Sequence, residues 1–206
     1  MFLQTHTGDL TLNSNVTCDL LSEGACINII LDDITLDCNG YSIIGPGDDI
    51  GTGIFVFGNN FIIKNCNVES FFIGIDDPFS TSTTVESSTL SNNDIGINQF
   101  GGPLTLENVL AENNRVGLKL LTGEEEVAID NAYFCNNSDQ DINVDDPFVE
   151  ETCPGVEATG QIFASTFGSD CSIEDAINES LEENEFDPIV SCTDLVAQQS
   201  LLSAGL

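Results

Sequence analysis

The side chains of this sequence that could take part in chemistry are almost all carboxylates. The 206 residues include 35 Asp and Glu against three Lys and Arg and one His, which gives a formal net charge of −32. Aspartate pairs recur, and those at Asp76-Asp77 and Asp145-Asp146 both begin the string Asp-Asp-Pro-Phe. Because calcium prefers clustered carboxylate oxygens, Asp76, Asp77, Asp145 and Asp146 are candidate calcium ligands. The alternative is a set of solvated loop acids, since the chain has neither an EF-hand nor a GGxGxD pattern.

The charge also restricts the partners that this chain could bind. A surface this acidic repels nucleic acid phosphates and anionic membranes, so we predict neither nucleic acid binding nor membrane insertion. No apolar run approaches the roughly 18 residues that a transmembrane helix needs. Motifs that bind nucleotides are absent as well.

The cysteines favour disulfide bonds over metal binding. No two of the eight form a CxxC pair and the only histidine is His6, so zinc-finger and iron–sulfur spacings are absent. An even number of widely spaced cysteines predicts disulfides and an oxidising, extracellular or cell-surface location. The candidates are Cys18, Cys26, Cys38, Cys66, Cys135, Cys153, Cys171 and Cys192.

These residues are embedded in an internal repeat. A glycine followed by an aliphatic residue recurs at Gly53, Gly74, Gly96 and Gly117, at intervals of 21, 22 and 21 residues. Other positions align in the same register. They include a column of Val68, Leu90, Ala111 and Phe134, and asparagine pairs at 92–93, 113–114 and 136–137.

Within each repeat, short runs alternate apolar and polar residues, which is the period of a β-strand and not of a helix. Strands that recur every 21–24 residues predict coils that stack on one another and bury their aliphatic side chains between them. The asparagines are expected at tight bends that require left-handed backbone, and the glycines are expected to relieve corners for the same reason. We therefore assign 1–150 to a parallel β-helix.

The last part of the chain, 151–206, departs from the repeat. Ser172 begins a capping-box pattern, and Ile173, Ile177 and Leu181 follow at helical spacing. We expect a small, partly helical C-terminal cap that covers the open end of the coils. The alternative is an extension that docks onto a neighbouring subunit.

The repeat also suggests how the cysteines pair. Cys38 and Cys66 fall near equivalent places in consecutive coils, about 4.8 Å apart, where a disulfide can form. Cys18 and Cys26 bracket the first coil. Cys135–Cys153 and Cys171–Cys192 would then connect the cap.

The stretch from Ile34 to Gly45, ITLDCNGYSIIG, resembles the "TLD-x-NG-x-x-I-x-G" opening of pectin-lyase-like proteins. The later coils resemble the parallel β-helix repeats of that superfamily, including NosD-like members, over about residues 8–145. The resemblance implies an all-β fold, a right-handed parallel β-helix. It says little about activity, because this fold carries lyases, hydrolases, adhesins and passive spacers.

Catalytic residues of such enzymes find little counterpart here. Pectate lyases of this fold abstract a proton with an arginine, a role for which only Arg115 is available, with Lys119 nearby. The alternative is a surface arginine paired with Asp94, one coil earlier. Polygalacturonases use clustered aspartates, which Asp76-Asp77 resembles, but their His and Arg–Lys motifs are missing. We predict no catalytic residue and no cofactor other than calcium.

The sequence therefore favours a non-enzymatic extracellular β-helix module that is structural, adhesive or glycan-contacting. Its expected partners are a glycan or further copies of itself in a surface assembly or filament. The alternative is a carbohydrate-active enzyme, a polysaccharide lyase or glycoside hydrolase of the pectin-lyase-like class.

Overall fold

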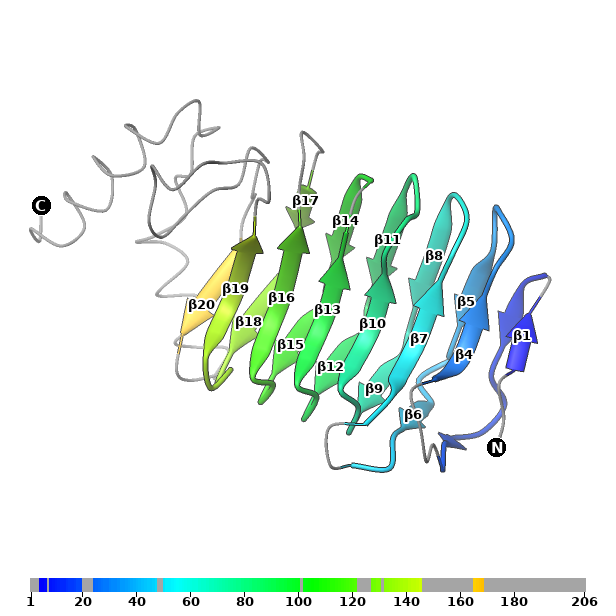
Figure 1. Ribbon diagram of the computed structural model, residues 1–206, viewed down its shortest axis with the longest axis horizontal. Coiled ribbons are helices and arrows are strands. Elements are labelled where there is room, and N and C mark those ends of the chain that lie inside the picture. The colour runs from blue at the N-terminus through cyan, green and yellow to red at the C-terminus, as the bar shows by residue number, and fades with distance from the viewer. Residues whose placement is uncertain are drawn as a thin grey trace, which may run out of the picture.

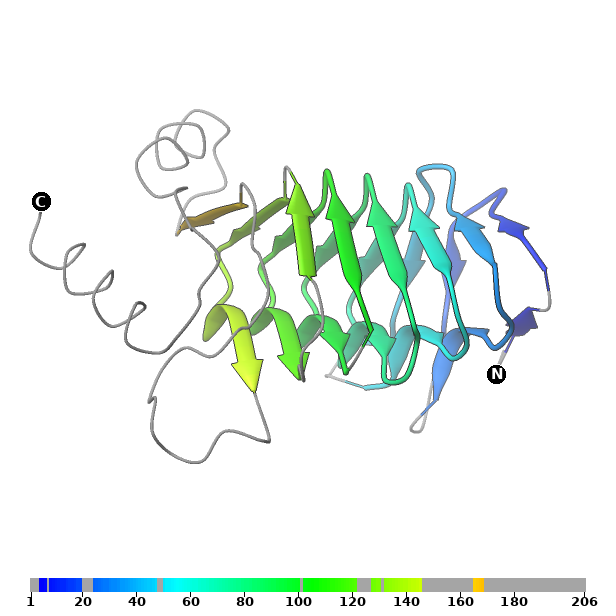
Figure 2. The same ribbon diagram turned by 90° about the horizontal axis from the view of Figure 1, so that it is seen from above.

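Every regular element that the structure describes is a β-strand. The computed structural model describes residues 4–6, 8–19, 24–47, 50–100, 102–121, 127–130, 132–145 and 165–168. The strands form three parallel sheets, with neighbours in each sheet coming from successive coils. The predicted all-β parallel β-helix is confirmed, and its coils stack along the long axis of the molecule (Figures 1 and 2).

The chain visits the three sheets in turn. Sheet A contains β1 (Gln4–His6), β4 (Ala25–Ile29), β7 (Thr52–Val56), β10 (Ile73–Asp77), β13 (Ile95–Gln99), β16 (Val116–Leu121) and β19 (Gln140–Asp145). Sheet B contains β2 (Leu10–Thr11), β5 (Thr35–Asp37), β8 (Phe61–Lys64), β11 (Thr83–Glu86), β14 (Leu104–Glu107) and β17 (Val127–Asp130). Sheet C contains β3 (Val16–Thr17), β6 (Ser42–Ile44), β9 (Asn67–Glu69), β12 (Thr89–Ser91), β15 (Leu110–Glu112), β18 (Ala132–Cys135) and β20 (Ser165–Gly168).

The strand register confirms the repeat. Ile54 lies opposite Ile75, which lies opposite Ile97, and the column continues through Leu118 to Ile142. The column of Val68, Leu90, Ala111 and Phe134 is equally in register. An earlier coil is longer, because Ile27 pairs with Ile54, 27 residues later.

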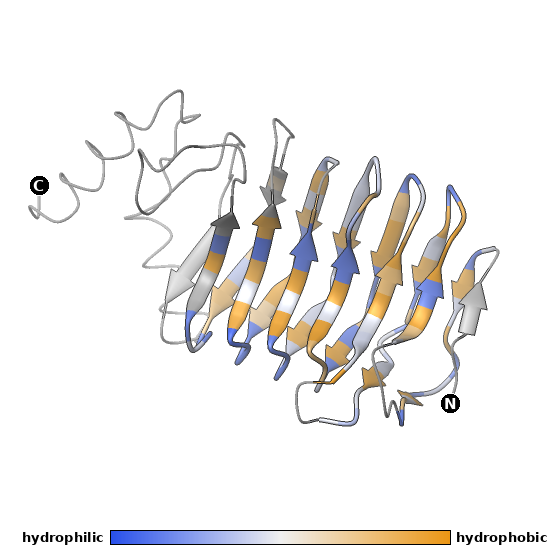
Figure 3. Ribbon diagram, in the orientation of Figure 1, coloured by the Kyte–Doolittle hydropathy of each residue, from blue (hydrophilic) through white to orange (hydrophobic). Residues whose placement is uncertain are grey.

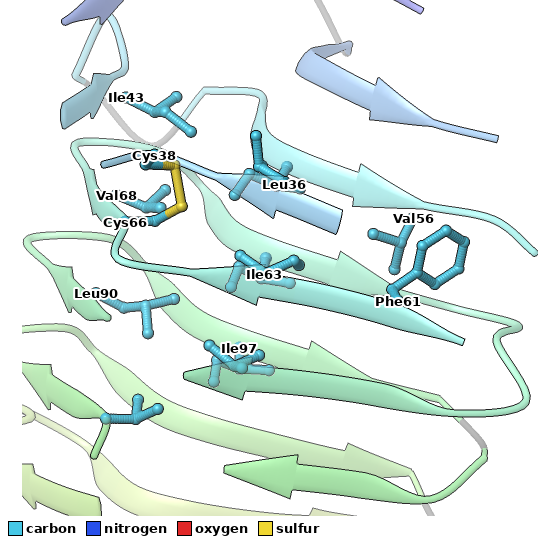
Figure 4. Close-up of a cluster of buried hydrophobic side chains, with 14 of the residues drawn as sticks. Leu36, Cys38, Ile43, Val56, Phe61, Ile63, Cys66, Val68, Leu90 and Ile97 are labelled. Carbon is cyan, nitrogen blue, oxygen red and sulfur yellow. A yellow bond between two sulfur atoms is a disulfide. The ribbon is translucent and has the colours of Figure 1, made fainter. Parts of the chain in front are cut away.

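The core is a set of apolar columns that run between the three sheets. Figure 4 shows Leu36 and Ile63 from sheet B beside Val68 and Leu90 from sheet C, and each of these side chains is at most 1% exposed. Burying an aliphatic side chain of this size contributes about 1.5–3 kcal/mol. Since each coil alone cannot cover such residues, the stacking of coils supplies the core.

Two predicted disulfides are present. Cys38 and Cys66 join consecutive coils across a Cα–Cα distance of 4.8 Å, and both side chains are fully buried (Figure 4). Cys18 and Cys26 form the second bridge, with their Cα atoms 5.8 Å apart. Cys135 is also disulfide-bonded. The pairings predicted with Cys153 and between Cys171 and Cys192 lie outside the described residues.

The corners of the coils carry the predicted left-handed asparagines. After sheet B, positive φ occurs at Asn39, Asn65, Ser87 and Asn108, and after sheet C at Ser70, Asn92, Asn113 and Asn136. Asparagine tolerates this backbone region better than most residues, since its short side chain hydrogen-bonds locally. The asparagine positions are therefore explained by backbone geometry.

The recurring glycines have a different cause from the expected one. Gly53, Gly74 and Gly96 do not have positive φ. A Cβ atom at Gly53 would lie 2.6 Å from the carbonyl oxygen of Gly74, and one at Gly96 would lie 2.4 Å from that of Gly117. The glycines thus allow neighbouring coils to approach closely, and are not needed for a left-handed corner.

The second asparagine of each pair forms a buried ladder. The Asn114 side chain accepts a hydrogen bond from the backbone N–H of Asn93 at 2.9 Å and donates one to the carbonyl of Leu90 at 3.0 Å. Asn137 accepts from the backbone N–H of Asn114 in the same way, at 3.0 Å. The ladder ends where the previous coil has Phe71, whose backbone N–H donates to Asn93. These amides therefore satisfy buried backbone groups between coils.

The predicted cap and its helical pattern lie outside the described residues, apart from one strand. Ser165–Gly168 forms β20, which pairs in parallel with β18 and so extends sheet C within the segment 151–206. Among the described residues there is no helix long and apolar enough to cross a membrane.

Replacing Asn114 by Ala should destabilise the fold strongly. The change leaves the backbone N–H of Asn93 and the carbonyl of Leu90 buried without these partners, so we expect a loss of about 3 kcal/mol in the free energy of unfolding. Urea denaturation of the parent and the variant measures this difference in the free energy of unfolding. Asn113→Gly is the matched control, because Asn113 is exposed with a φ of 55° that glycine adopts readily. A loss of under about 0.5 kcal/mol for Asn114→Ala would contradict the structural role of the ladder.

Candidate functional site

The aspartates proposed as calcium ligands in β10 face opposite sides of the sheet. Asp77 points inward, is fully buried, and accepts hydrogen bonds from the Ser80 hydroxyl and the Thr83 hydroxyl, both at 2.5 Å. The Ser80 backbone N–H donates to its other oxygen at 3.0 Å. Asp77 therefore fastens the turn after β10 from inside the core.

Asp76 lies on the outer face of the same strand. Its carboxylate accepts a hydrogen bond from the Asn98 side chain at 2.8 Å. Burial raises the pKa of Asp76 above its ordinary value of 3.8 and nearby Asp77 raises it further, while the bond from Asn98 lowers it. The two aspartates do not converge on one point, so an ion at Asp76 would take its other ligands from elsewhere.

The second pair of calcium candidates is only partly described. Asp145 is the last residue of β19, and its side chain and Asp146 lie outside the described residues. In the described part of the chain, no group of three or more His, Cys, Asp or Glu side chains is arranged to hold a metal. Calcium binding stays a prediction.

Asp76 belongs to a polar column on the outside of sheet A, the "outer column". Strand register aligns it with one residue from each neighbouring coil, and the members whose side chains are described are Asn28, Phe55, Asp76, Asn98, Lys119 and Asn143. Figure 3 shows hydrophilic bands near the arrowheads of β10, β13 and β16. At about 4.8 Å per coil, the six residues span about 24 Å. The column thus aligns amides, a carboxylate, an amine and one aromatic ring in a row, of which Asn98 is buried and the others are half-buried.

One group in this column is short of a partner. The side-chain nitrogen of Asn28 is buried and has no hydrogen-bond partner among the described residues. Buried polar groups are usually satisfied, so this nitrogen is an unfavourable feature within the described part of the column. Hydroxyl-rich ligands both donate and accept, which suits this mixture of side chains.

Arg115 forms an ion bridge across three consecutive coils. Its Nε and Nη2 donate to the two carboxylate oxygens of Asp94 at 2.7 and 2.9 Å, and its Nη1 donates to Asp139 at 2.9 Å. The hydrogen bonds that Arg115 donates to Asp94 are the main reason that the pKa of Arg115 is raised above its ordinary value. The predicted pairing with Asp94 is confirmed, and the guanidinium is held cationic, which opposes its use as a base.

A shallow groove lies at the corner between sheets B and C. It has a volume of about 370 Å³ and is lined by Asn39, Gly40, Asn65, Asn67 and Ser87. Asn65 donates to Asp37 at 3.0 Å, and Asn67 donates to the Gly40 carbonyl at 3.0 Å. The amides that donate here hold neighbouring coils together.

Asp37 beside this groove is stabilised as a carboxylate. The hydrogen bond from Asn65 lowers its pKa most, the backbone N–H of Asn39 lowers it further, and Lys64, 3.8 Å away, adds a smaller attraction. Lys64 thus also pairs with an acid of the preceding coil.

Sequence reasoning missed a row of exposed phenylalanines. Phe57, Phe79 and Phe100 follow the ends of β7, β10 and β13, and all three are exposed. Their spacings of 22 and 21 residues match the repeat, which was the signal that could have revealed them.

Arg115→Gln should weaken the fold modestly. Removing a half-exposed ion bridge costs about 1 kcal/mol, and the loss should shrink in 1 M NaCl because salt screens exposed charges. Arg115→Lys is the control, since it keeps the charge and loses the two-pronged contact with Asp94. Denaturation at both salt concentrations measures the effect, and an equal loss in low and high salt would contradict an electrostatic role.

Two aspartates should affect the pH dependence of stability in opposite directions. The raised pKa of Asp76 means that protonation favours the folded state, so stability rises as pH falls toward 3.8 and Asp76→Asn should raise the melting temperature at pH 7. The lowered pKa of Asp37 contributes stability above about pH 4 that is lost as pH falls through the folded value. The substitution Asp37→Asn should therefore lower the melting temperature at pH 7. In acid, where Asp37 is protonated in both states, the substitution should no longer lower it. Melting curves of both variants between pH 3 and 7 test the two expectations. A lower melting temperature for Asp76→Asn and a higher one for Asp37→Asn at pH 7 would refute them.

Comparisons with known proteins add no family to this geometry. No protein-family model, no curated protein and no solved structure matches the chain.

Proposed function

We propose that this chain is a non-enzymatic, extracellular β-helix module of the pectin-lyase-like superfamily, which contacts glycans through the outer column of sheet A. The observation that carries the proposal is the ion bridge of Arg115. A proton-abstracting arginine must be available to lose its charge, whereas Arg115 is bound by Asp94 and Asp139. The side chain that a lyase of this fold would use is committed to joining coils.

The disulfides support an extracellular location. Cys38–Cys66 and Cys18–Cys26 each contribute stability by restricting the unfolded chain, and such bonds persist in oxidising compartments. A stack of coils stapled in this way is a rigid rod, which suits a spacer or adhesive element.

The outer column supports the contact with glycans. An extended sugar chain offers hydroxyl groups at intervals along its length, and amides with a carboxylate can donate to and accept from them. Phe55 adds an apolar ring surface within the same row, next to Asp76 in register. A neutral glycan fits best, because uronates would meet a protein of net charge −32.

Asp76 favours one rival function, a glycoside hydrolase. A carboxyl group with a raised pKa suits a general acid, and glycosidases pair such an acid with a second carboxylate. The described residues of the outer column include no second carboxylate. The experiment described next distinguishes glycan binding from glycoside hydrolysis.

The proposal is tested by incubating the protein with a panel of neutral and acidic polysaccharides, with and without calcium. We expect retention of the protein by at least one neutral polysaccharide and no release of reducing or unsaturated ends. Phe55→Ala should weaken binding by about tenfold, which corresponds to about 1.4 kcal/mol. Thr105→Ala, on the outer side of sheet B, is the control and should bind normally.

Clear turnover that is lost in Asp76→Asn would replace the proposal with the glycosidase. Turnover lost in Arg115→Lys would replace it with a lyase. Binding that Phe55→Ala leaves unchanged would mean that the outer column is not the contact surface.

A further inference from the structure

Four consecutive coils expose an apolar side chain at the turn between sheets A and B. Ile30 is 43% exposed, Phe57 50%, Phe79 68% and Phe100 46%. These four residues form the "aromatic stripe". The Phe57 N–H donates to the Ile29 carbonyl at 2.8 Å, and the Phe100 N–H donates to the Asp77 carbonyl at 2.9 Å, so the stripe follows the stacking of the coils.

Two neighbouring rings of the stripe contact each other while remaining exposed. Those of Phe57 and Phe79 lie 5.9 Å apart at 81°, an edge-to-face arrangement. At about 4.8 Å per coil, the stripe extends over about 14 Å. The core does not use these side chains, which are exposed and follow the C-terminal ends of strands of sheet A, the ends drawn as arrowheads in Figure 1. Exposed apolar side chains that gather on successive coils in this way are typical of an interaction site.

One end of the stripe, beside Ile30, is acidic. Asp32 and Asp33 follow Ile30 and Leu31 in the same turn and are exposed. The side chain of Asn59 in the next coil donates to Asp32 at 2.8 Å, and that of Asn60 donates to Asp33 at 2.9 Å, so both carboxylates are held at this edge. The described connections between sheets A and B contain no basic residue. The stripe therefore offers apolar contact along its length and negative charge at its Ile30 end.

We propose that the aromatic stripe docks a cationic amphipathic helix of another polypeptide, with its apolar face on the phenylalanines and its Lys or Arg side chains toward Asp32 and Asp33. About ten helical residues span 14 Å, so a helix of three turns would cover the stripe. Lysine and arginine can keep their charges at the edge while their methylene groups cover apolar surface. This surface is separate from the outer column, and the inference does not depend on glycan binding.

Charge also decides against a second copy of this chain as the occupant. Two copies each carry a net charge of −32, and their acidic turns would face each other across such a contact. Salt separates the two cases, because screening weakens the attraction of a cationic helix and relieves the repulsion between two copies. The direction of the salt effect is therefore diagnostic.

The test uses the full chain and a synthetic amphipathic peptide of about fourteen residues, built from Leu and Lys at helical spacing. Fluorescence anisotropy measures its affinity. A scrambled peptide with the same composition serves as the probe control. We expect the scrambled peptide to bind at least about tenfold more weakly, and the affinity of the amphipathic peptide to fall as NaCl rises from 50 to 500 mM.

Phe79→Ser should weaken binding of the amphipathic peptide by about tenfold without changing the net charge. Phe72→Ser is the matched control. Phe72 is 43% exposed but precedes β10, so it lies at the opposite end of that strand from the stripe. The affinity of the Phe72→Ser variant for the peptide should stay within about twofold of that of the parent protein. Phe79 is chosen because it is the most exposed member of the stripe. Circular dichroism checks that both variants fold.

Equal binding by Phe79→Ser and the parent would overturn the proposal, since only general attraction to a polyanion would remain. Equal binding of the scrambled peptide, or no binding at all, would overturn it too. Sedimentation that shows stripe-dependent self-association, increasing with salt, would assign the stripe to a second copy instead.

Discussion

The alignment of each coil with the next is the constraint on which the rest of this structure depends. A parallel strand satisfies its backbone only through its neighbours, so a shift by one residue would turn every core side chain outward. Three devices hold the register: the close approach of coils at Gly53, Gly74 and Gly96, the left-handed corners, and the asparagine ladder. The two described disulfides add covalent links at the N-terminal coils, where the coil length changes from 27 to 21 residues.

The same stacking explains what happens to the charged and polar groups. Residues at equivalent positions lie about 4.8 Å apart, so carboxylates in one column would repel unless a cation or an amide intervened. Arg115 separates Asp94 from Asp139, and Asn98 lies beside Asp76. The polar side chains of these two groups thus have a structural partner in a neighbouring coil.

The sequence was informative wherever a residue type reports a backbone requirement. Asparagine at the corners and cysteine in consecutive coils led directly to the register and to the Cys38–Cys66 bridge. The roles of adjacent residues were less visible, because Asp76 and Asp77 look alike in sequence although alternation puts one outside and the other in the core. The aromatic stripe was missed because phenylalanine is ordinarily assigned to the core, and its exposure depends on which side of a turn it occupies.

The outer column and the ion bridge needed the three-dimensional register as well as the pattern. Arg115 was paired correctly with Asp94, but Asp139 lies 24 residues further on and joins the bridge only because a coil of that length returns to the same corner. Polar residues that are scattered over 115 positions in the sequence form one row in space. A pattern in the sequence locates the coils, whereas side-chain direction and contact decide what each site can do.

Native-state hydrogen exchange, followed by NMR, tests most directly whether the alignment of coils holds the fold. The backbone amides of Asn93 and Asn114 donate to side chains of the next coil. If this alignment dominates stability, they exchange only through the same global opening as the core strand amide of Ile97, with matching free energies of exchange. Exchange of the two asparagine amides at rates typical of an exposed loop, while Ile97 stays protected, would show that the coils are held by the apolar core alone.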